Sequence, residues 1–127
     1  MNILIAEDDH SSRELLREML ALWGHRIIEC RNGEEALSEL HQHAVDLIIL
    51  DIQMPVLDGL GAIRKIRDSR LAPTPALALT AFAMAGDKEK MLAAGFDAHL
   101  AKPVDFLQLK LLVDGVAESK GQARRAE

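Results

Sequence analysis

Side chains that could do chemistry stand at the ends of four short apolar runs in this 127-residue chain. In chain order these side chains are Glu7, Asp8, Asp9, Asp51, Thr80 and Lys102. Carboxylates that are packed together repel one another, so they must take up protons or share a cation. Oxygen ligands in a small site favour Mg²⁺, which often joins carboxylates to a phosphoryl group.

This set of groups suits phosphoryl transfer. The cation would reduce the charge on an incoming phosphoryl oxygen, so that an aspartate could approach it. Lys102 and the hydroxyl of Thr80 could hold the remaining oxygens, and the attacking carboxylate would become an aspartyl phosphate. Each residue taken alone has an ordinary explanation as a turn, cap or surface residue. The hypothesis of phosphoryl transfer depends on the combination, because four separate strand ends supply groups that this reaction needs together.

Apolar runs alternate with helical periods along the whole chain. The runs expected to be strands cover residues 2–6, 26–30, 47–50, 76–79 and 98–101. Each is followed by a helical pattern, and the last two helices are expected over 84–94 and 104–116. Five strand–helix units predict an α/β fold, a doubly wound five-stranded parallel sheet in the order 2-1-3-4-5, flavodoxin-like, with five flanking helices. The site of such a sheet lies at the carboxyl ends of its strands, where these side chains stand.

The first helix shows the clearest local signals. Ser11 and Glu14 have the spacing of a capping box, which predicts the helix start, and Gly24 predicts its end. The residues expected on its inward face are Leu15, Leu16, Met19, Leu20 and Trp23. We expect one domain over residues 1–117 and a polar, flexible tail over 118–127.

The composition of the chain restricts the class of protein, its partners and its location. The chain is 49% hydrophobic and 28% charged, as in an ordinary globular domain, and its net charge of -5 argues against direct nucleic-acid binding. The single cysteine, Cys30, excludes an internal disulfide and fits a reducing compartment. No apolar stretch is long enough to span a membrane, and no secretory signal is evident, so the cytoplasm is the expected location.

Four motifs resemble those of response-regulator receiver domains in two-component signalling. They are Ile3-Leu4-Ile5-Ala6-Glu7-Asp8-Asp9, Asp51-Ile52-Gln53-Met54-Pro55 with Asp58-Gly59, Leu79-Thr80-Ala81, and Lys102-Pro103. They stand in the family's order and cover about residues 1 to 117. Further segments, 80–87 and 93–99, resemble receivers attached to hybrid histidine kinases or their single-domain relatives.

The resemblance implies a role for each matched residue. Asp51 would be the phospho-acceptor. The implied metal ligands, for Mg²⁺ or Mn²⁺, are Asp8, Asp51, the backbone carbonyl of Gln53 and, through water, Glu7. Thr80, Lys102 and the backbone of Ala81 would bind the phosphoryl group. His99 stands where receivers often carry Tyr or Phe, three residues before the lysine, and is the implied switch position.

The resemblance also implies partners. A histidine kinase or a histidine phosphotransfer protein would donate the phosphoryl group, and an unknown downstream protein would read the change on the face formed by the fourth helix, fifth strand and fifth helix. The domain would catalyse only its own phosphorylation and dephosphorylation. We expect no membrane partner.

Two other functions stay open at this stage. A small Mg²⁺-dependent phosphatase with an aspartate nucleophile uses a similar set of groups, but usually has its nucleophile after the first strand and carries a cap. A docking domain independent of phosphorylation would tolerate decay of the site, yet every required residue is present. A flavin phosphate site fits less well, because three acids after the first strand would repel a phosphate.

Overall fold

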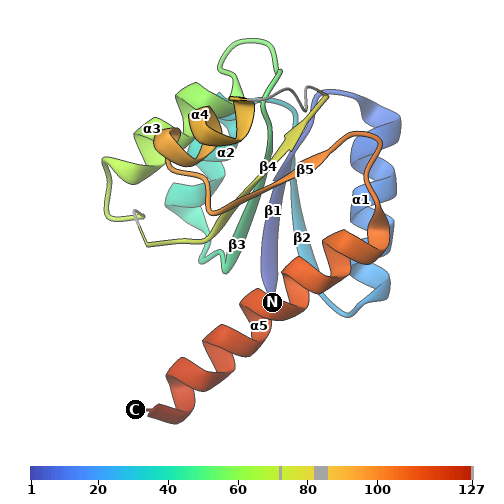
Figure 1. The fold of residues 1–127 in the computed structure, drawn as a ribbon, viewed down its shortest axis with the longest axis vertical. Coiled ribbons are helices and arrows are strands. Elements are labelled where there is room, and N and C mark those ends of the chain that lie inside the picture. Colours follow the sequence, from blue (N-terminus) through green and yellow to red (C-terminus); the bar gives the residue numbers. More distant parts are fainter. Residues whose placement is uncertain (72, 82–85, 127) are drawn as a thin grey trace.

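The chain forms a parallel sheet between two layers of helices in the computed structural model, which describes residues 1–71, 73–81 and 86–126 (Figure 1). The strands are β1 (Asn2–Ala6), β2 (Arg26–Cys30), β3 (Leu47–Asp51), β4 (Ala76–Thr80) and β5 (Ala98–Ala101). The helices are α1 (His10–Leu22), α2 (Gly33–Gln42), α3 (Gly59–Arg67), α4 (Asp87–Ala94) and α5 (Phe106–Ala126). All strand pairs are parallel and the order is β2-β1-β3-β4-β5, which confirms the predicted fold class.

Each face of the sheet carries its own apolar core. Helices α2, α3 and α4 cover one face, and α1 and α5 cover the other (Figure 1). The central strands β1, β3 and β4 are almost completely buried, as expected for strands that are covered on both faces. This double layer fixes the strands, so that the residues at their carboxyl ends have set positions.

Two details of α1 differ from the prediction. Its N-cap is Asp9, whose carboxylate accepts a hydrogen bond from the Ser12 amide at 2.9 Å, so Ser11 is not the cap. Leu15 was expected to face inward but is 47% exposed, while Leu16 and Leu20 are buried. The apolar stripe of α1 is therefore narrower than the pattern of leucines indicated.

The last two helices also have different bounds. The expected fourth helix began at Met84, but residues 82–85 lie outside the described part of the chain, and α4 is described from Asp87. The final helix was expected over 104–116. Instead α5 begins at Phe106, after an Asp105 carboxylate that accepts from the amides of Leu107 and Gln108, and continues to Ala126. Figure 1 shows that its C-terminal half extends past the sheet.

Val56 has an unfavourable backbone conformation in the loop between β3 and α3. Its φ is 68°, in the left-handed region that β-branched residues avoid, and its side chain is 80% exposed. We expect Val56→Gly to raise the free energy of unfolding by about 1 kcal/mol, because the cost of the left-handed conformation exceeds the added chain entropy of glycine. Urea denaturation measures this. Val56→Ala keeps the strain and serves as the control, and an equal gain in that variant would contradict the explanation.

Candidate functional site

Three carboxylates meet where β1 and β3 end. Glu7, Asp8 and Asp51 each offer an oxygen within 4.8 Å of the others, an arrangement that could hold a metal ion. Glu7 and Asp51 are only 1% and 3% exposed, while Asp8 is open to solvent. The pairing of Ala6 with Leu50 in adjacent strands brings the next residues of both strands to one edge. The cluster is thus a direct consequence of strand register.

Lys102 joins this cluster from the loop after β5. Its Nζ donates to Asp51 Oδ2 at 2.5 Å and to Glu7 Oε2 at 2.7 Å. The Lys102 amide also donates to the carbonyl of Thr80, which fixes the start of this loop against β4, and the following peptide bond to Pro103 is cis. A single ammonium thus neutralises part of a buried acidic pair.

The acids and the lysine shift each other's protonation. Burial, together with the hydrogen bond and charge of Asp51, raises the pKa of Glu7 to about 7, although Lys102 opposes this. Burial disfavours the charged form of Lys102, but hydrogen bonds to Asp51 and Glu7 outweigh it and raise the pKa of the lysine. Burial and the neighbouring Asp51 therefore disfavour the charged form of Glu7 when no metal is bound.

This raised pKa predicts a pH-dependent stability in the absence of metal. Between about pH 4.5 and about pH 7, folded Glu7 keeps a proton that the unfolded chain releases. The folded state then binds more protons, so the free energy of unfolding should fall as pH rises through this window. Glu7→Gln, which stays neutral, should flatten this slope in urea denaturation with a chelator present. Glu18→Gln on the exposed side of α1 is the control, and an unchanged slope in Glu7→Gln would contradict the assignment.

An open cleft of about 650 Å³ lies beside the acids, and its lining residues come from the loops after β1 and β3. They are Asp8, Ile52, Gln53, Met54, Pro55 and Asp58. The amide of Gln53 donates to Asp51 Oδ1 at 3.0 Å, which orients the carboxylate. Asp58 caps α3 through the Gly61 amide at 2.8 Å. The cleft gives a small ligand access to Asp8, and its lining includes Ile52, the residue directly after Asp51.

The other predicted residues lie on the neighbouring strands. Thr80 ends β4 and is 3% exposed, while Ala81 directly after it is exposed. His99 is half-buried in β5, where it pairs with Ala78, while Thr80 pairs with Ala101. Thr80 and His99 therefore lie on adjacent strands, offset by two register positions. The structure brings Glu7, Asp8, Asp51 and Lys102 into one cluster and places Thr80 on β4 and His99 on β5.

One residue that contacts this site was not anticipated. Arg13 is 7% exposed on the inner side of α1, and its Nη1 donates to the carbonyl of Glu7 at 2.9 Å. A sequence signal was present, because Arg13 precedes Leu16 and Leu20 at the spacing of one helical face. An arginine in such an apolar stripe needs a buried acceptor.

No helix in the described part of the chain is long and apolar enough to cross a membrane.

The carboxyl edge of this doubly wound parallel sheet thus carries three clustered acids that could hold a metal ion, a lysine in contact with two of them, and an open cleft. Residues 3–114 match the response regulator receiver domain family, and the chain belongs to that family. It is thus a receiver domain of two-component signalling, and receiver domains are signalling proteins.

Relatives and solved structures agree with this assignment. The polar-differentiation response regulator DivK of Brucella anthropi is 38% identical over 104 residues, covering 81% of this chain and 85% of DivK. The receiver domain of sensor histidine kinase PA1611 from Pseudomonas aeruginosa PAO1, solved with a magnesium ion in its active site cleft, has a TM-score of 0.81 and 35% identity, over 87% of this chain and 92% of that one.

A third match comes from a complex. It is the co-crystal structure of the Saccharomyces cerevisiae histidine phosphotransfer signaling protein Ypd1 with the receiver domain of Ssk1, with a TM-score of 0.81 and 32% identity. The match covers 87% of this chain and 83% of that one.

Proposed function

We propose that this domain accepts a phosphoryl group on Asp51 from a phosphohistidine donor. In this step an Asp51 oxygen forms a bond to phosphorus as the phosphorus–nitrogen bond breaks, and the departing imidazole takes up a proton from water to become neutral histidine. The observation that carries the proposal is the cluster of Glu7, Asp8 and Asp51 within 4.8 Å, with an open cleft lined by Asp8 and by the residues directly after Asp51.

The same cluster would hold a divalent cation, Mg²⁺ or Mn²⁺. The direct ligands would be Asp8, Asp51 and the backbone carbonyl of Gln53, with Glu7 assisting through water. When bound, the cation supplies charge neutralisation for the phosphoryl oxygens. The donor set is all oxygen, which fits these hard cations, and the three carboxylates lie close enough together to share one cation.

The residues around Asp51 would hold the new group. Lys102, which already contacts Asp51, would pair with a phosphoryl oxygen instead. The backbone of Ala81 and the hydroxyl of Thr80 would donate to the others. The domain would also catalyse the loss of this group, and its only reactions would be its own phosphorylation and dephosphorylation.

The test is incubation with a phosphorylated histidine phosphotransfer protein, with Mg²⁺ and with a chelator. We expect label to pass to this domain only when the divalent cation is present, and to be acid-stable and base-labile. Steady turnover of small phosphate esters would favour a phosphatase instead. Absence of transfer from any phosphohistidine donor, with the fold intact, would favour a phosphorylation-independent docking domain.

A switch that couples Thr80 to His99 would carry the signal. Once a phosphoryl oxygen is present, Thr80 moves toward it and vacates space that the His99 side chain fills, so that a local charge event changes the packing of α4, β5 and α5. Helix α4 is suited to move, because its N-cap, Gly86, makes no side-chain hydrogen bond and Met91 is the one residue of this helix that is buried. Its C-terminal end is held, since Arg67 donates to the Gly95 carbonyl at 2.8 Å.

We predict that His99→Ala weakens binding of the downstream partner about tenfold, as expected for loss of an allosteric coupling of 1–3 kcal/mol. Phosphoryl uptake should change less than twofold, roughly, because His99 makes no bond to the reacting group. Amide exchange with a phosphoryl mimic and Mg²⁺ gives a direct check. Changes confined to the loops around Asp51, with none from residue 86 to 102, would contradict signalling through this face.

Four further proposals concern the phosphoryl donor, the downstream protein, the location and the domain bounds. The donor would be a histidine kinase or a histidine phosphotransfer protein, and a separate protein would read the output without nucleic acid or membrane. The location in the cytoplasm stays a prediction, as does the division into a domain over 1–117 and a separate segment over 118–127. Proteolysis that removes the second segment without loss of the fold would support that division.

A further inference from the structure

We propose that Arg13 is a positioning residue for the metal site, because its guanidinium holds the Glu7 carbonyl and so orients the neighbouring Asp8 carboxylate toward the cluster. The inference rests on the metal site proposed above. Arg13 touches none of the three carboxylates in the hydrogen bonds and ion pairs of the described residues, so its action would pass through the main chain.

The main chain around Asp8 is held on both sides. The Glu7 amide donates to the Cys30 carbonyl of β2 at 3.0 Å, and the Glu7 carbonyl accepts from Arg13 at 2.9 Å. On the other side, the Asp9 amide donates to Glu7 Oε1 at 3.2 Å. Asp8 is therefore an exposed residue between two fixed peptide groups. Arg13 is the side chain that fixes the first of them.

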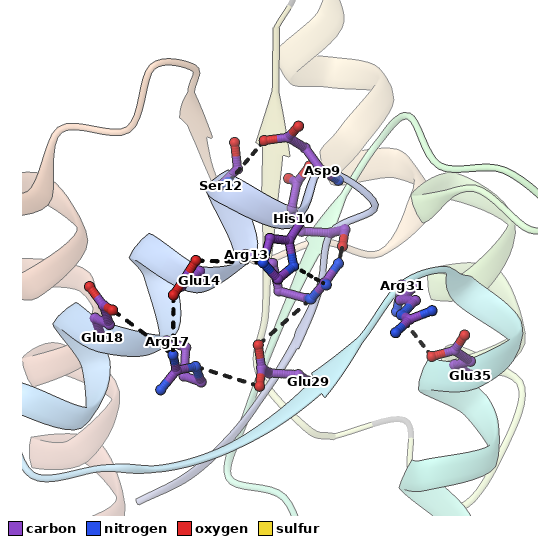
Figure 2. A network of polar contacts seen from close by, with 11 residues as sticks. Asp9, His10, Ser12, Arg13, Glu14, Arg17, Glu18, Glu29, Arg31 and Glu35 are labelled. Atoms are coloured by element: carbon purple, nitrogen blue, oxygen red, sulfur yellow. Dashed lines mark hydrogen bonds and ion pairs between the residues drawn. The ribbon is translucent and has the colours of Figure 1, made fainter.

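The guanidinium of Arg13 is itself fixed by its surroundings, as Figure 2 shows. Its Nη2 donates to His10 Nδ1 at 3.1 Å, and its Nε lies 3.6 Å from Glu29 Oε1. Arg17 reaches the other oxygen of Glu29 at 3.5 Å. The carboxylate of Glu29 on β2 is thus shared by two arginines of α1, which sets the position of Arg13.

The two arginines make a matched pair for experiment. Both come from α1 and both contact Glu29, but only Arg13 reaches the segment that carries Asp8. Arg17 lies one helical turn further along and is 40% exposed at its side chain, whereas that of Arg13 is 9% exposed. Substitution of either arginine would weaken the ionic contact between α1 and Glu29 on β2. Only substitution of Arg13 would also change the geometry of the metal site.

The test is Mg²⁺ binding by calorimetry and by the shift in melting temperature, with Arg13→Gln, Arg13→Lys and Arg17→Gln. We expect the Mg²⁺ Kd of Arg13→Gln to rise about tenfold, the usual effect of losing a partner that orients a ligand. The Mg²⁺ Kd of Arg13→Lys should rise roughly threefold, because lysine can still donate one hydrogen bond to the carbonyl. The Mg²⁺ Kd of Arg17→Gln should stay within roughly twofold of the wild-type value.

A second readout separates positioning from general stability. At saturating Mg²⁺, phosphoryl labelling of Arg13→Gln should reach the wild-type level, while the Mg²⁺ concentration for half-maximal labelling rises in step with Kd. A wild-type Kd in Arg13→Gln would overturn the role of Arg13 and leave the metal site standing. If Arg13→Gln does not fold, a wild-type Kd in Arg13→Lys would overturn it. Absence of Mg²⁺ binding in the wild type would overturn the metal site as well.

Discussion

Asp51→Asn is expected to lose phosphoryl labelling from a phosphohistidine donor by a factor on the order of 100 or more, since the nucleophile itself is removed. The amide of asparagine cannot form the acyl phosphate that a carboxylate forms. Asp51 is 3% exposed, and the Gln53 amide and Lys102 fix its carboxylate. The measurement is transfer of label from the donor at saturating Mg²⁺.

The control is the same isosteric change at another aspartate. Asp105 caps α5 through the amides of Leu107 and Gln108, and asparagine is an equally good cap. Asp105→Asn should therefore label at the wild-type rate. Wild-type labelling of Asp51→Asn under the same conditions would mean that the phosphoryl group goes elsewhere.

The second large effect is expected from Asp8→Ala. Ligand binding stabilises a fold by mass action, by about 2.7 kcal/mol when the ligand is at 100 times its Kd. At 100 times its Kd, Mg²⁺ should stabilise the wild type by this amount. The same Mg²⁺ concentration should stabilise Asp8→Ala by less than about 1 kcal/mol, because a direct ligand is gone. Without metal the variant should be as stable as the wild type or more so, since one member of a repelling cluster is absent.

Asp9→Asn is the matched control for Asp8→Ala. Asp9 is the next acid in the same loop, but its carboxylate accepts from the Ser12 amide and caps α1, a role that asparagine keeps. Its stabilisation by Mg²⁺ should match that of the wild type. Thermal melts over a series of Mg²⁺ concentrations measure both variants. An undiminished shift in Asp8→Ala would exclude Asp8 as a ligand.

The fold could be predicted because its signals are local and repeated. The apolar run 47–50 is continuous, as expected for a strand covered on both faces, and it is buried along its whole length. The predicted strand ends then indicated that Glu7, Asp8, Asp51 and Lys102 lie together, because the carboxyl ends of parallel strands share one edge of the sheet. These four side chains do meet at that edge.

What the sequence left undetermined depends on contacts between distant segments. The cap of α1 is Asp9 because the chain turns there after β1, which the Ser11–Glu14 spacing did not reveal. Leu15 is 47% exposed, and with Val104 and Phe106 from the chain after β5 it lines a pocket of about 250 Å³. The contact of Arg13 depends on the Glu7 carbonyl, which lies directly after β1. No helical pattern in α1 alone could identify that acceptor.

The most direct test of the account is to locate the phosphoryl group by trapping it. Borohydride reduces an acyl phosphate of aspartate to the alcohol, so the phosphorylated residue is converted to homoserine and can be found by peptide mass spectrometry. After incubation with a phosphohistidine donor and Mg²⁺, we predict homoserine at position 51 and none when the cation is chelated. Conversion at Asp8 or Asp9 with Asp51 unchanged, or labelled protein without any conversion, would contradict Asp51 as the acceptor.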